Sequence, residues 1–133
     1  MARRTKQIRT FDPLDPVYGY QWINLLRGKI RHGLAKEGRD SLHLEGFLRA
    51  YYVFSLWDNW LARARVGGLY SVEIEMIERA GVDPRHLAQI AQQHRKVQQW
   101  REDQLHLLFP CGTPDWMVLL LDWPAQMLIT HGY

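Results

Sequence analysis

The stretch "ARVGGLYSVEIE", residues 64–75, decides the fold because its two adjacent glycines permit two incompatible structures. Gly67 and Gly68 can end one helix, with Ser71 capping the next. They can also turn a β-hairpin, because apolar and polar residues alternate after Ser71 as they do in a strand. The stretch by itself leaves both structures open.

Helical spacing of apolar residues surrounds this stretch on both sides. It predicts a helix over residues 20–32, ended by Gly33, and a second, strongly patterned helix within residues 42–61. A third helix is predicted from Asp83, as the N-cap, to a point before Pro110. In the apolar tail, "WMVLLL" fits a buried strand or a short buried helix equally well.

At 133 residues and 47% hydrophobic content, the chain has enough apolar material for one domain. We expect three segments along it. Residues 1–19 form a basic N-terminal arm and a proline-rich lead-in, residues 20–109 form a helical domain that includes the region of the two glycines, and residues 110–133 form an apolar C-terminal tail. Six tryptophans and six tyrosines predict either a dense core or burial completed against partners.

Composition also indicates the compartment. The single cysteine, Cys111, has no partner for an internal disulfide or a CxxC metal site, which favours a reducing compartment. No apolar run is long enough to span a bilayer, so we expect no membrane contact. The opening "MARRTKQIRT" lacks the apolar core of a secretory signal, although its arginines and lack of acids suit a short organellar presequence.

Motifs for catalysis and cofactor binding are not found. The sequence contains no GxxxxGK[ST], GxGxxG or GxSxG pattern. His86 and His94 are eight residues apart, too far to share one tetrahedral ion without another element. Cys111 has no basic neighbour to activate it, which favours a structural thiol. We therefore predict no catalytic residue, no metal and no cofactor.

The distribution of charge is the strongest functional signal in the composition. Residues 1–65 hold 12 basic and 6 acidic side chains, a net of +6, whereas residues 66–133 hold 5 and 8, a net of −3. Such asymmetry suggests that the first half contacts a polyanion, although a solvated surface can have it by chance. The candidate RNA-binding residues are Arg3, Arg4, Lys6, Arg9, Lys29, Arg31, Lys36, Arg39, Arg63 and Arg65.

Several motifs, in order along residues 1–96, resemble small-subunit ribosomal protein seven. Residues 15–19, "DPVYG", are similar to the DPxYG signature of that family. "INLLRGKIRHG" and "SLHLEGFLRA" are similar to its first two helices, and "RARVGGLYSVEIE" resembles its RRVGG…VPVE hairpin, with Glu73 in place of the proline. The basic C-terminal region of the family and its terminal aromatic motif are not recognisable.

The ribosomal resemblance implies a structural role in translation. The chain would bind small-subunit ribosomal RNA in the head, beside neighbouring ribosomal proteins, and its hairpin would reach toward messenger RNA and exit-site tRNA. Gly67 and Gly68 would form the hairpin turn, and Arg63 and Arg65 would position that ribbon through backbone contacts. The departures favour a divergent ribosomal protein in a mitochondrial or other organellar ribosome, with a ribosome of the bacterial cytoplasm as the alternative. Its apolar tail would pack on a neighbouring protein.

A second resemblance implies a different fold for the same stretch. "PVYGYQW" and "SLWDNWLARA" followed by "GLYSVEIE", within residues 16–80, are similar to the helical N-terminal region of nitrile hydratase β subunits. There the tryptophan helix runs on, and the glycine precedes a capped helix. The chain would then be a β-like or accessory subunit of an enzyme complex, whose metal ligands lie on another subunit. A helical adaptor or phage structural component is the third alternative.

The basic first half and the ordered series of motifs favour the ribosomal interpretation. We therefore predict a mainly α fold, a single helical domain with a basic N-terminal arm and a β-hairpin near residues 60–76. The state of that segment separates the two resemblances, because one requires strand pairing across the glycines and the other requires two helices.

Overall fold

A computed structural model describes residues 16–122, and between these limits it contains five helices and no strand. The prediction of a mainly α fold is therefore confirmed. The N-terminal arm and the end of the tail lie outside the described residues. The helices are α1 (Pro16–Lys36), α2 (Leu44–Ala64), α3 (Ser71–Arg79), α4 (Leu87–Leu108) and α5 (Asp115–Asp122).

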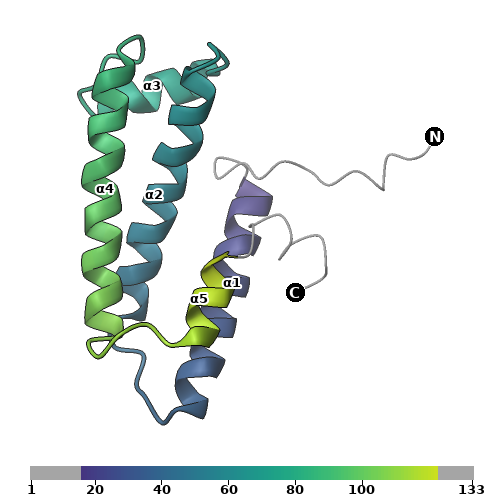
Figure 1. Ribbon diagram of the computed structural model, residues 1–133. Helices are drawn as coiled ribbons and strands as arrows, with labels where there is room; N and C mark the ends of the chain where they lie inside the picture. The colour runs from purple at the N-terminus through teal and green to yellow at the C-terminus, as the bar shows by residue number, and fades with distance from the viewer. Residues whose placement is uncertain (1–15, 123–133) are drawn as a thin grey trace, which may run out of the picture.

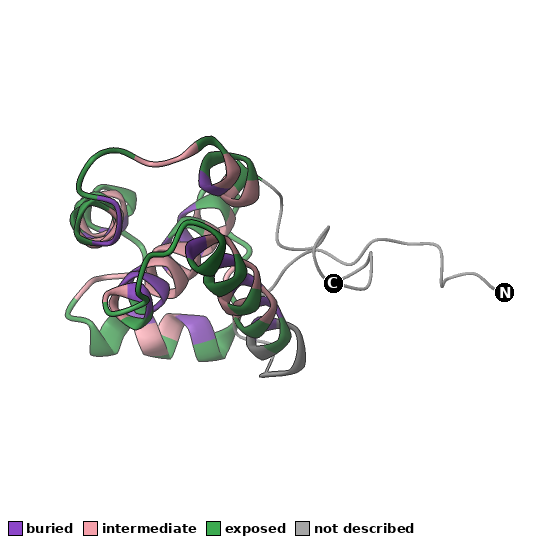
Figure 2. Cartoon of the chain, turned by 90° about the horizontal axis from the view of Figure 1, so that it is seen from below, coloured by how far each residue is buried: buried purple, intermediate pink, exposed green. Residues whose placement is uncertain are grey.

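Helices α2 and α4 make the most extensive contact in the bundle, and they lie side by side and antiparallel (Figure 1). The short helix α3 joins their upper ends, while α1 packs against α2, and α5 lies along α1. Seen from below, buried residues face the spaces between helices and exposed residues cover the outside (Figure 2). This is the pattern of a bundle whose helices each turn an apolar stripe inward.

Buried side chains form two clusters, and α2 and α4 contribute to both. The lower cluster joins α1, α2, the end of α4 and α5, and the upper cluster joins α2, α3 and α4. Tyr51 helps to connect α2 to α5, since its hydroxyl donates a hydrogen bond to the Leu121 carbonyl at 3.4 Å. The buried members are Trp22, Leu26, Ile30, Leu34, Leu44, Phe47, Leu48, Leu108, Phe109 and Met117 below, and Trp57, Trp60, Leu61, Ile77, Ile90 and Val97 above.

The predicted hairpin near residues 60–76 is wrong, because α2 runs to Ala64 and α3 begins at Ser71. Gly67 adopts a left-handed conformation with φ of +68°, and Gly68 does not have a positive φ. The Gly67 amide donates to the Ala64 carbonyl at 3.1 Å, and the Gly68 amide donates to the Arg63 carbonyl at 2.9 Å. These two bonds are a Schellman motif, so the glycines end a helix rather than turn a hairpin.

Burial explains why the segment after the glycines is helical. A strand would bury Val72 and expose Glu73, yet Val72 is 52% exposed and Glu73 is completely buried. Glu73 and Ile77, one helical turn apart, are the buried residues of α3. The Glu73 carboxylate also accepts a hydrogen bond from the Tyr70 amide at 2.8 Å, which satisfies a backbone donor at the start of the helix.

Two boundaries of α1 differ from the sequence prediction. The helix begins at Pro16, inside the predicted lead-in, and continues past Gly33 to Lys36. Gly38, with φ of +68°, follows the helix instead. Gly33 has another purpose, because a Cβ atom there would come within 2.5 Å of the Trp116 indole. Glycine at that position lets α5 pack closely on α1.

The start of α4 differs from the sequence prediction, and the structure decides between the two alternatives for the apolar tail. His86, not Asp83, is the N-cap of α4. The Asp83 carboxylate accepts a hydrogen bond from the Arg85 amide at 2.9 Å, forming a turn before the helix. The predicted end of α4 before Pro110 is confirmed, and "WMVLLL" is helical, as α5.

Alanine at the two glycines tests this structure. Gly67→Ala should lower the free energy of unfolding by about 1 kcal/mol, because alanine is strained at a positive φ. Gly68→Ala should change it by less than about 0.5 kcal/mol, because its Cβ would meet only ordinary contacts at 3.7 Å. Urea denaturation followed by circular dichroism measures both. Equal losses would contradict the helix end, since a type I′ hairpin turn needs a positive φ at both positions.

Candidate functional site

The structure places six of the ten predicted RNA-binding residues. Arg3, Arg4, Lys6 and Arg9 lie outside the described residues. The other six occupy three places: Lys29, Arg31 and Lys36 on α1, Arg39 in the following loop, and Arg63 and Arg65 at the end of α2.

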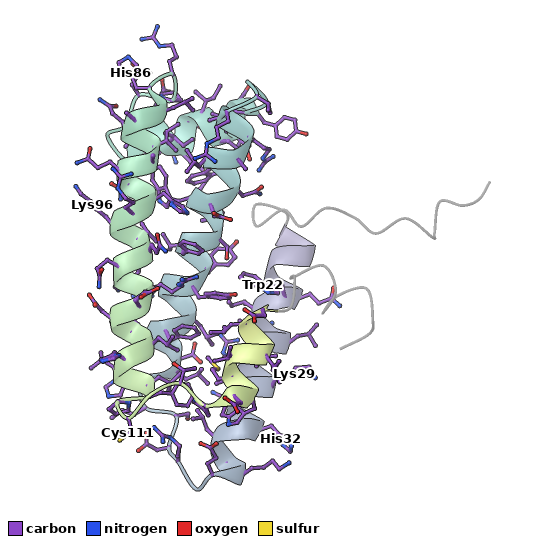
Figure 3. All side chains as sticks on the ribbon, in the orientation of Figure 1. Trp22, Lys29, His32, His86, Lys96 and Cys111 are labelled. Carbon is purple, nitrogen blue, oxygen red and sulfur yellow. The ribbon has the colours of Figure 1, made fainter. Side chains whose placement is uncertain are left out.

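These six residues do not converge on one face. The end of α1 lies at the bottom of the bundle, whereas the end of α2 lies at the top (Figure 1). Figure 3 shows Lys29 low on α1, with its side chain directed away from α2 and α4. A single RNA-binding face would require these residues to lie close together, and within residues 16–122 they are divided between two ends of the bundle.

Arg39 fastens the loop between α1 and α2 to the end of α4. Its guanidinium donates a hydrogen bond to the Leu108 carbonyl at 3.1 Å. The same group lies 5.1 Å from the centre of the Phe109 ring, within cation–π distance. These contacts give Arg39 a structural role in the lower cluster.

Arg63 and Glu73 form the polar centre of the corner between α2 and α3. The Arg63 guanidinium pairs with the Glu73 carboxylate, which has no exposed surface. The central carbon of the guanidinium lies 5.4 Å from the centre of the Tyr70 ring. A buried carboxylate needs a cation and hydrogen bonds to offset its lost hydration. Arg63, predicted to contact RNA, therefore holds the corner together.

The corner exposes apolar side chains around this pair. Val66 is 81% exposed, Tyr70 is 62% exposed and Val72 is 52% exposed. Scattered apolar side chains are normal on a protein surface, but three in seven residues on one projecting turn are the kind of patch that partners cover.

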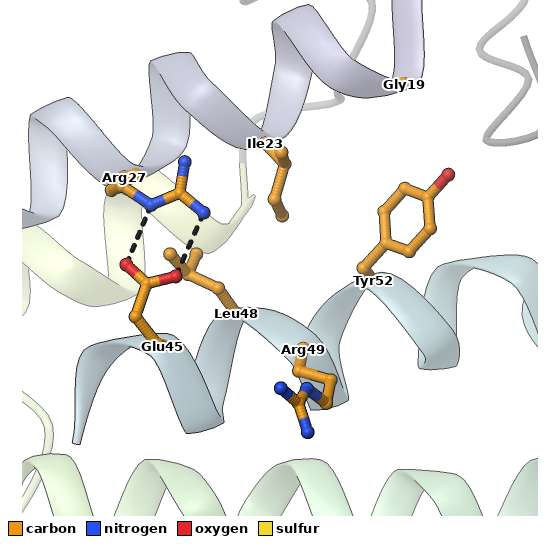
Figure 4. Close-up of a pocket in the computed structure, with 7 residues that line it drawn as sticks. All are labelled: Gly19, Ile23, Arg27, Glu45, Leu48, Arg49 and Tyr52. Atoms are coloured by element: carbon orange, nitrogen blue, oxygen red, sulfur yellow. Dashed lines mark hydrogen bonds and ion pairs between the residues drawn. The ribbon is translucent and has the colours of Figure 1, made fainter. Parts of the chain in front are cut away.

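A pocket of about 410 Å³ lies between α1 and α2 (Figure 4). Its wall contains an ion pair in which Arg27 donates two hydrogen bonds to Glu45, at 2.8 and 3.0 Å. The Arg27 guanidinium lowers the pKa of the Glu45 carboxyl below its ordinary value. Arg49 and Tyr52 lie on the α2 side of the same pocket.

A groove of about 590 Å³ lies between α1 and α5. One side carries Lys29, His32 and Lys36 from α1, and the other carries Trp116 and Leu120 from α5. The groove thus combines basic and aromatic groups. Its base is fixed by the close approach of α5 to α1 and by a hydrogen bond from the Trp116 indole nitrogen to the Glu37 carboxylate at 2.6 Å.

A third and larger pocket, of about 870 Å³, lies beside α3. It is lined by apolar residues together with Glu78, Asp83 and Arg85. The Arg85 side chain donates to both Asp83 oxygens, at 3.2 and 3.1 Å, and its amide adds a third bond at 2.9 Å. These bonds lower the pKa of Asp83 to about 2.

The histidines and the cysteine do not form a reactive group. Over residues 16–122, no three His, Cys, Asp or Glu side chains come together as a metal site. His94 lies between α2 and α4, 3.0 Å from the Asp58 carboxylate and 5.0 Å from the centre of the Phe54 ring. Cys111 is exposed in the loop before α5. The walls of these three pockets contain no nucleophile–base pair.

Sequence reasoning missed the two contacts that define these surfaces. The Arg63–Glu73 pair had a local signal, since Glu73 stands at the third position of a capping pattern after the glycines. The Trp116–Glu37 hydrogen bond joins residues 79 positions apart, and no local pattern predicts it.

Comparisons with known proteins leave the family open. No family model matches the chain, and neither a curated protein nor a solved structure matches it. Among the helices described, none has both the length and the apolar character needed to cross a bilayer.

The buried ion pair predicts a large effect for Arg63→Met. The free energy of unfolding should fall by about 3 kcal/mol, because the substitution leaves the buried Glu73 side chain without its cation. The double variant Arg63→Met/Glu73→Met should lose less than the sum of the two single changes. As the control, Glu75→Gln breaks an exposed pair with Arg79 and should cost less than about 0.5 kcal/mol. Additive losses in urea denaturation would contradict the pairing.

The Asp83 carboxyl gives a prediction about pH. Its lowered pKa means that the Arg85 contacts stabilise the fold above about pH 4 and lose this effect as the pH falls through about 2. Arg85→Ala should move the pKa of Asp83 back toward 3.8. Titration of the carboxyl carbon by NMR measures this shift. Arg79→Ala, the control, should leave the pKa of Asp83 unchanged, and a similar shift in both variants would contradict a specific role for Arg85.

Proposed function

We propose that this chain is a non-catalytic helical subunit of an enzyme complex, similar to the helical N-terminal region of nitrile hydratase β subunits. In this proposal the chain contributes structure and contact surface, and the reaction takes place on a partner chain.

The course of the chain from residue 57 to residue 71 supports this proposal. The resemblance implies that the tryptophan helix continues and that glycine precedes a new helix. In the structure α2 continues through Trp57 and Trp60 to Ala64, and Gly67 ends it before α3 begins at Ser71. Both tryptophans are buried in the upper cluster, so the continuation is part of the core.

Exposed apolar side chains give independent support for assembly with other chains. They occur at the corner, as Val66 and Val72, and on α5, as Val118 and Leu119. Covering apolar surface is the main gain in stable protein–protein contacts. A subunit that completes its burial in a complex is also consistent with the high aromatic content of the chain.

Binding to small-subunit ribosomal RNA stays a prediction of the sequence. Lys29, Arg31 and Lys36 still give α1 a basic side, which favours a polyanion. The ribbon expected to reach messenger RNA and tRNA is instead a helical corner, and Arg63 is occupied there by Glu73. We therefore keep RNA binding as the second candidate function. A ribosomal location in a mitochondrion depends on that function.

Purification of the tagged full-length chain from its native source tests both functions. The extract is divided, one half is treated with ribonuclease, and both are separated on a density gradient. We expect the chain to migrate at the same position in both halves, in a complex whose other members are enzyme subunits in fixed ratio.

Sedimentation with small ribosomal subunits, lost after ribonuclease treatment, would contradict the proposal and support the ribosomal interpretation. Migration as a free chain in both halves would contradict both. The Arg63→Met variant tests whether assembly requires the intact corner, and the amount of complex should fall with it.

A further inference from the structure

The α1–α5 groove has a basic side made by one face of α1. Lys29, His32 and Lys36 follow each other at spacings of three and four residues, which places them in one row along the helix. The row covers two helical turns, about 10 Å. Figure 3 shows Lys29 and His32 on the outer side of α1, away from α2 and α4.

The opposite side of the groove is apolar and extends beyond it. Trp116 and Leu120 line the groove, and Leu119 follows Trp116 by three residues, so it lies next to the same wall. Leu119 is 63% exposed, a large apolar surface on a helix of eight residues. The groove is therefore bordered by a row of basic groups on one helix and a row of apolar groups on the other.

Two glycines, Gly28 and Gly33, line the α1 side of the groove. Gly33 is required by the fold, because the Trp116 indole occupies the space of a Cβ atom. Gly28 has no such requirement, since a Cβ atom there would have no neighbour within 4 Å. Glycine inside a helix is less favourable than alanine, and at Gly28 it leaves backbone open to close approach from outside.

From these features we propose that the α1–α5 groove is the docking site for an amphipathic helix of a partner protein, one that carries carboxylates along one edge of its apolar face. The inference rests on the proposed function, since it names the surface through which the subunit would join its complex. The apolar face would cover Trp116, Leu119 and Leu120, and the carboxylates would meet Lys29 and Lys36.

Charge complementarity selects an acidic helix. Glu37, an exposed acidic residue of the groove lining, accepts the hydrogen bond from the Trp116 indole. Lys29 and Lys36 outnumber this single carboxylate among the residues that line the groove. A helix lying in a groove anchors itself through apolar residues at spacings of three, four and seven, which the partner helix would present to Trp116 and Leu120.

A binding assay with two designed peptides tests the inference on the full-length chain. The first is a dye-labelled helix of about five turns, with leucines on one face and glutamates along its edge. The second has lysines in place of the glutamates. Fluorescence anisotropy should detect binding of the glutamate peptide, with affinity at least about tenfold higher than that of the lysine peptide.

Charge reversal identifies the surface that the peptide uses. Lys29→Glu/Lys36→Glu should weaken binding of the glutamate peptide about tenfold. The matched control is Arg95→Glu/Lys96→Glu on α4, which makes the same change in net charge on exposed residues elsewhere. The control should change the affinity by less than about twofold. Lys36→Glu alone, on an exposed residue, provides a milder variant if the double change disturbs folding.

The apolar wall has its own pair of variants. Leu119→Asp should abolish detectable binding of the peptide, whereas Leu107→Asp, on a leucine of α4 that is 50% exposed, should leave it unchanged. Equal effects of these two changes, or of the two charge reversals, would overturn the inference, because binding would then be non-specific. Equal binding of both peptides, or of neither, would also overturn it.

A single-stranded RNA oligonucleotide tests the competing class of partner. If the oligonucleotide binds more tightly than the glutamate peptide and responds to the same variants, the groove is a polyanion site and the inference fails. If the Lys29→Glu/Lys36→Glu chain still joins its native complex, the inference also fails while the proposed function stands. If the wild-type chain joins no complex, the proposed function fails, and the peptide assay still decides whether the groove binds an acidic helix.

Discussion

The antiparallel pairing of α2 and α4 is the constraint on which the rest of the structure depends, because both helices pass through both core clusters. Contacts of charged side chains with aromatic and acidic groups hold these two helices in register. The Arg101 guanidinium lies 4.1 Å from the centre of the Phe54 ring, and His94 contacts Asp58 at 3.0 Å. The position of this helix pair determines where the other three helices pack. One end carries α3 and the corner, and the other receives α1 and α5, so each surface depends on a different part of one helix pair.

Sequence patterns predicted the long helices but could not decide the connections between them. Repeated apolar spacing is a property of about 20 residues, whereas a turn depends on few residues and on what surrounds them. The residues around Gly67 and Gly68 are compatible with both a helix end and a hairpin turn. The helical form is favoured by the burial of Glu73 against Arg63, a contact between two helices that local sequence does not show. The prediction of Asp83 as the N-cap of α4 was wrong for a related reason. Its carboxylate accepts a hydrogen bond from the Arg85 amide, in the turn that precedes α4.

The candidate site was predicted less well than the fold, since charge that is clustered in sequence need not be clustered in space. Among the basic residues of the first half, Arg39 and Arg63 are used by the fold, one on the Leu108 carbonyl and one on Glu73. Lys29 and Lys36 do share a surface, but the aromatic group facing them comes from Trp116, far away in the sequence. A one-dimensional count of charge could find the basic side of that groove and could not find its apolar side.

The stability of α5 links the groove to assembly. An isolated helix of eight residues is far too short to be stable in water, so α5 depends on packing against α1. The helix α1 in turn contains Gly28 and Gly33, both unfavourable inside a helix, and gains stability from the lower cluster. The two helices around the groove are thus less self-sufficient than α2 and α4. A partner that bound both of them would stabilise them together, because any ligand that prefers the folded form increases its population. Binding across α1 and α5 would therefore increase the local order of both helices.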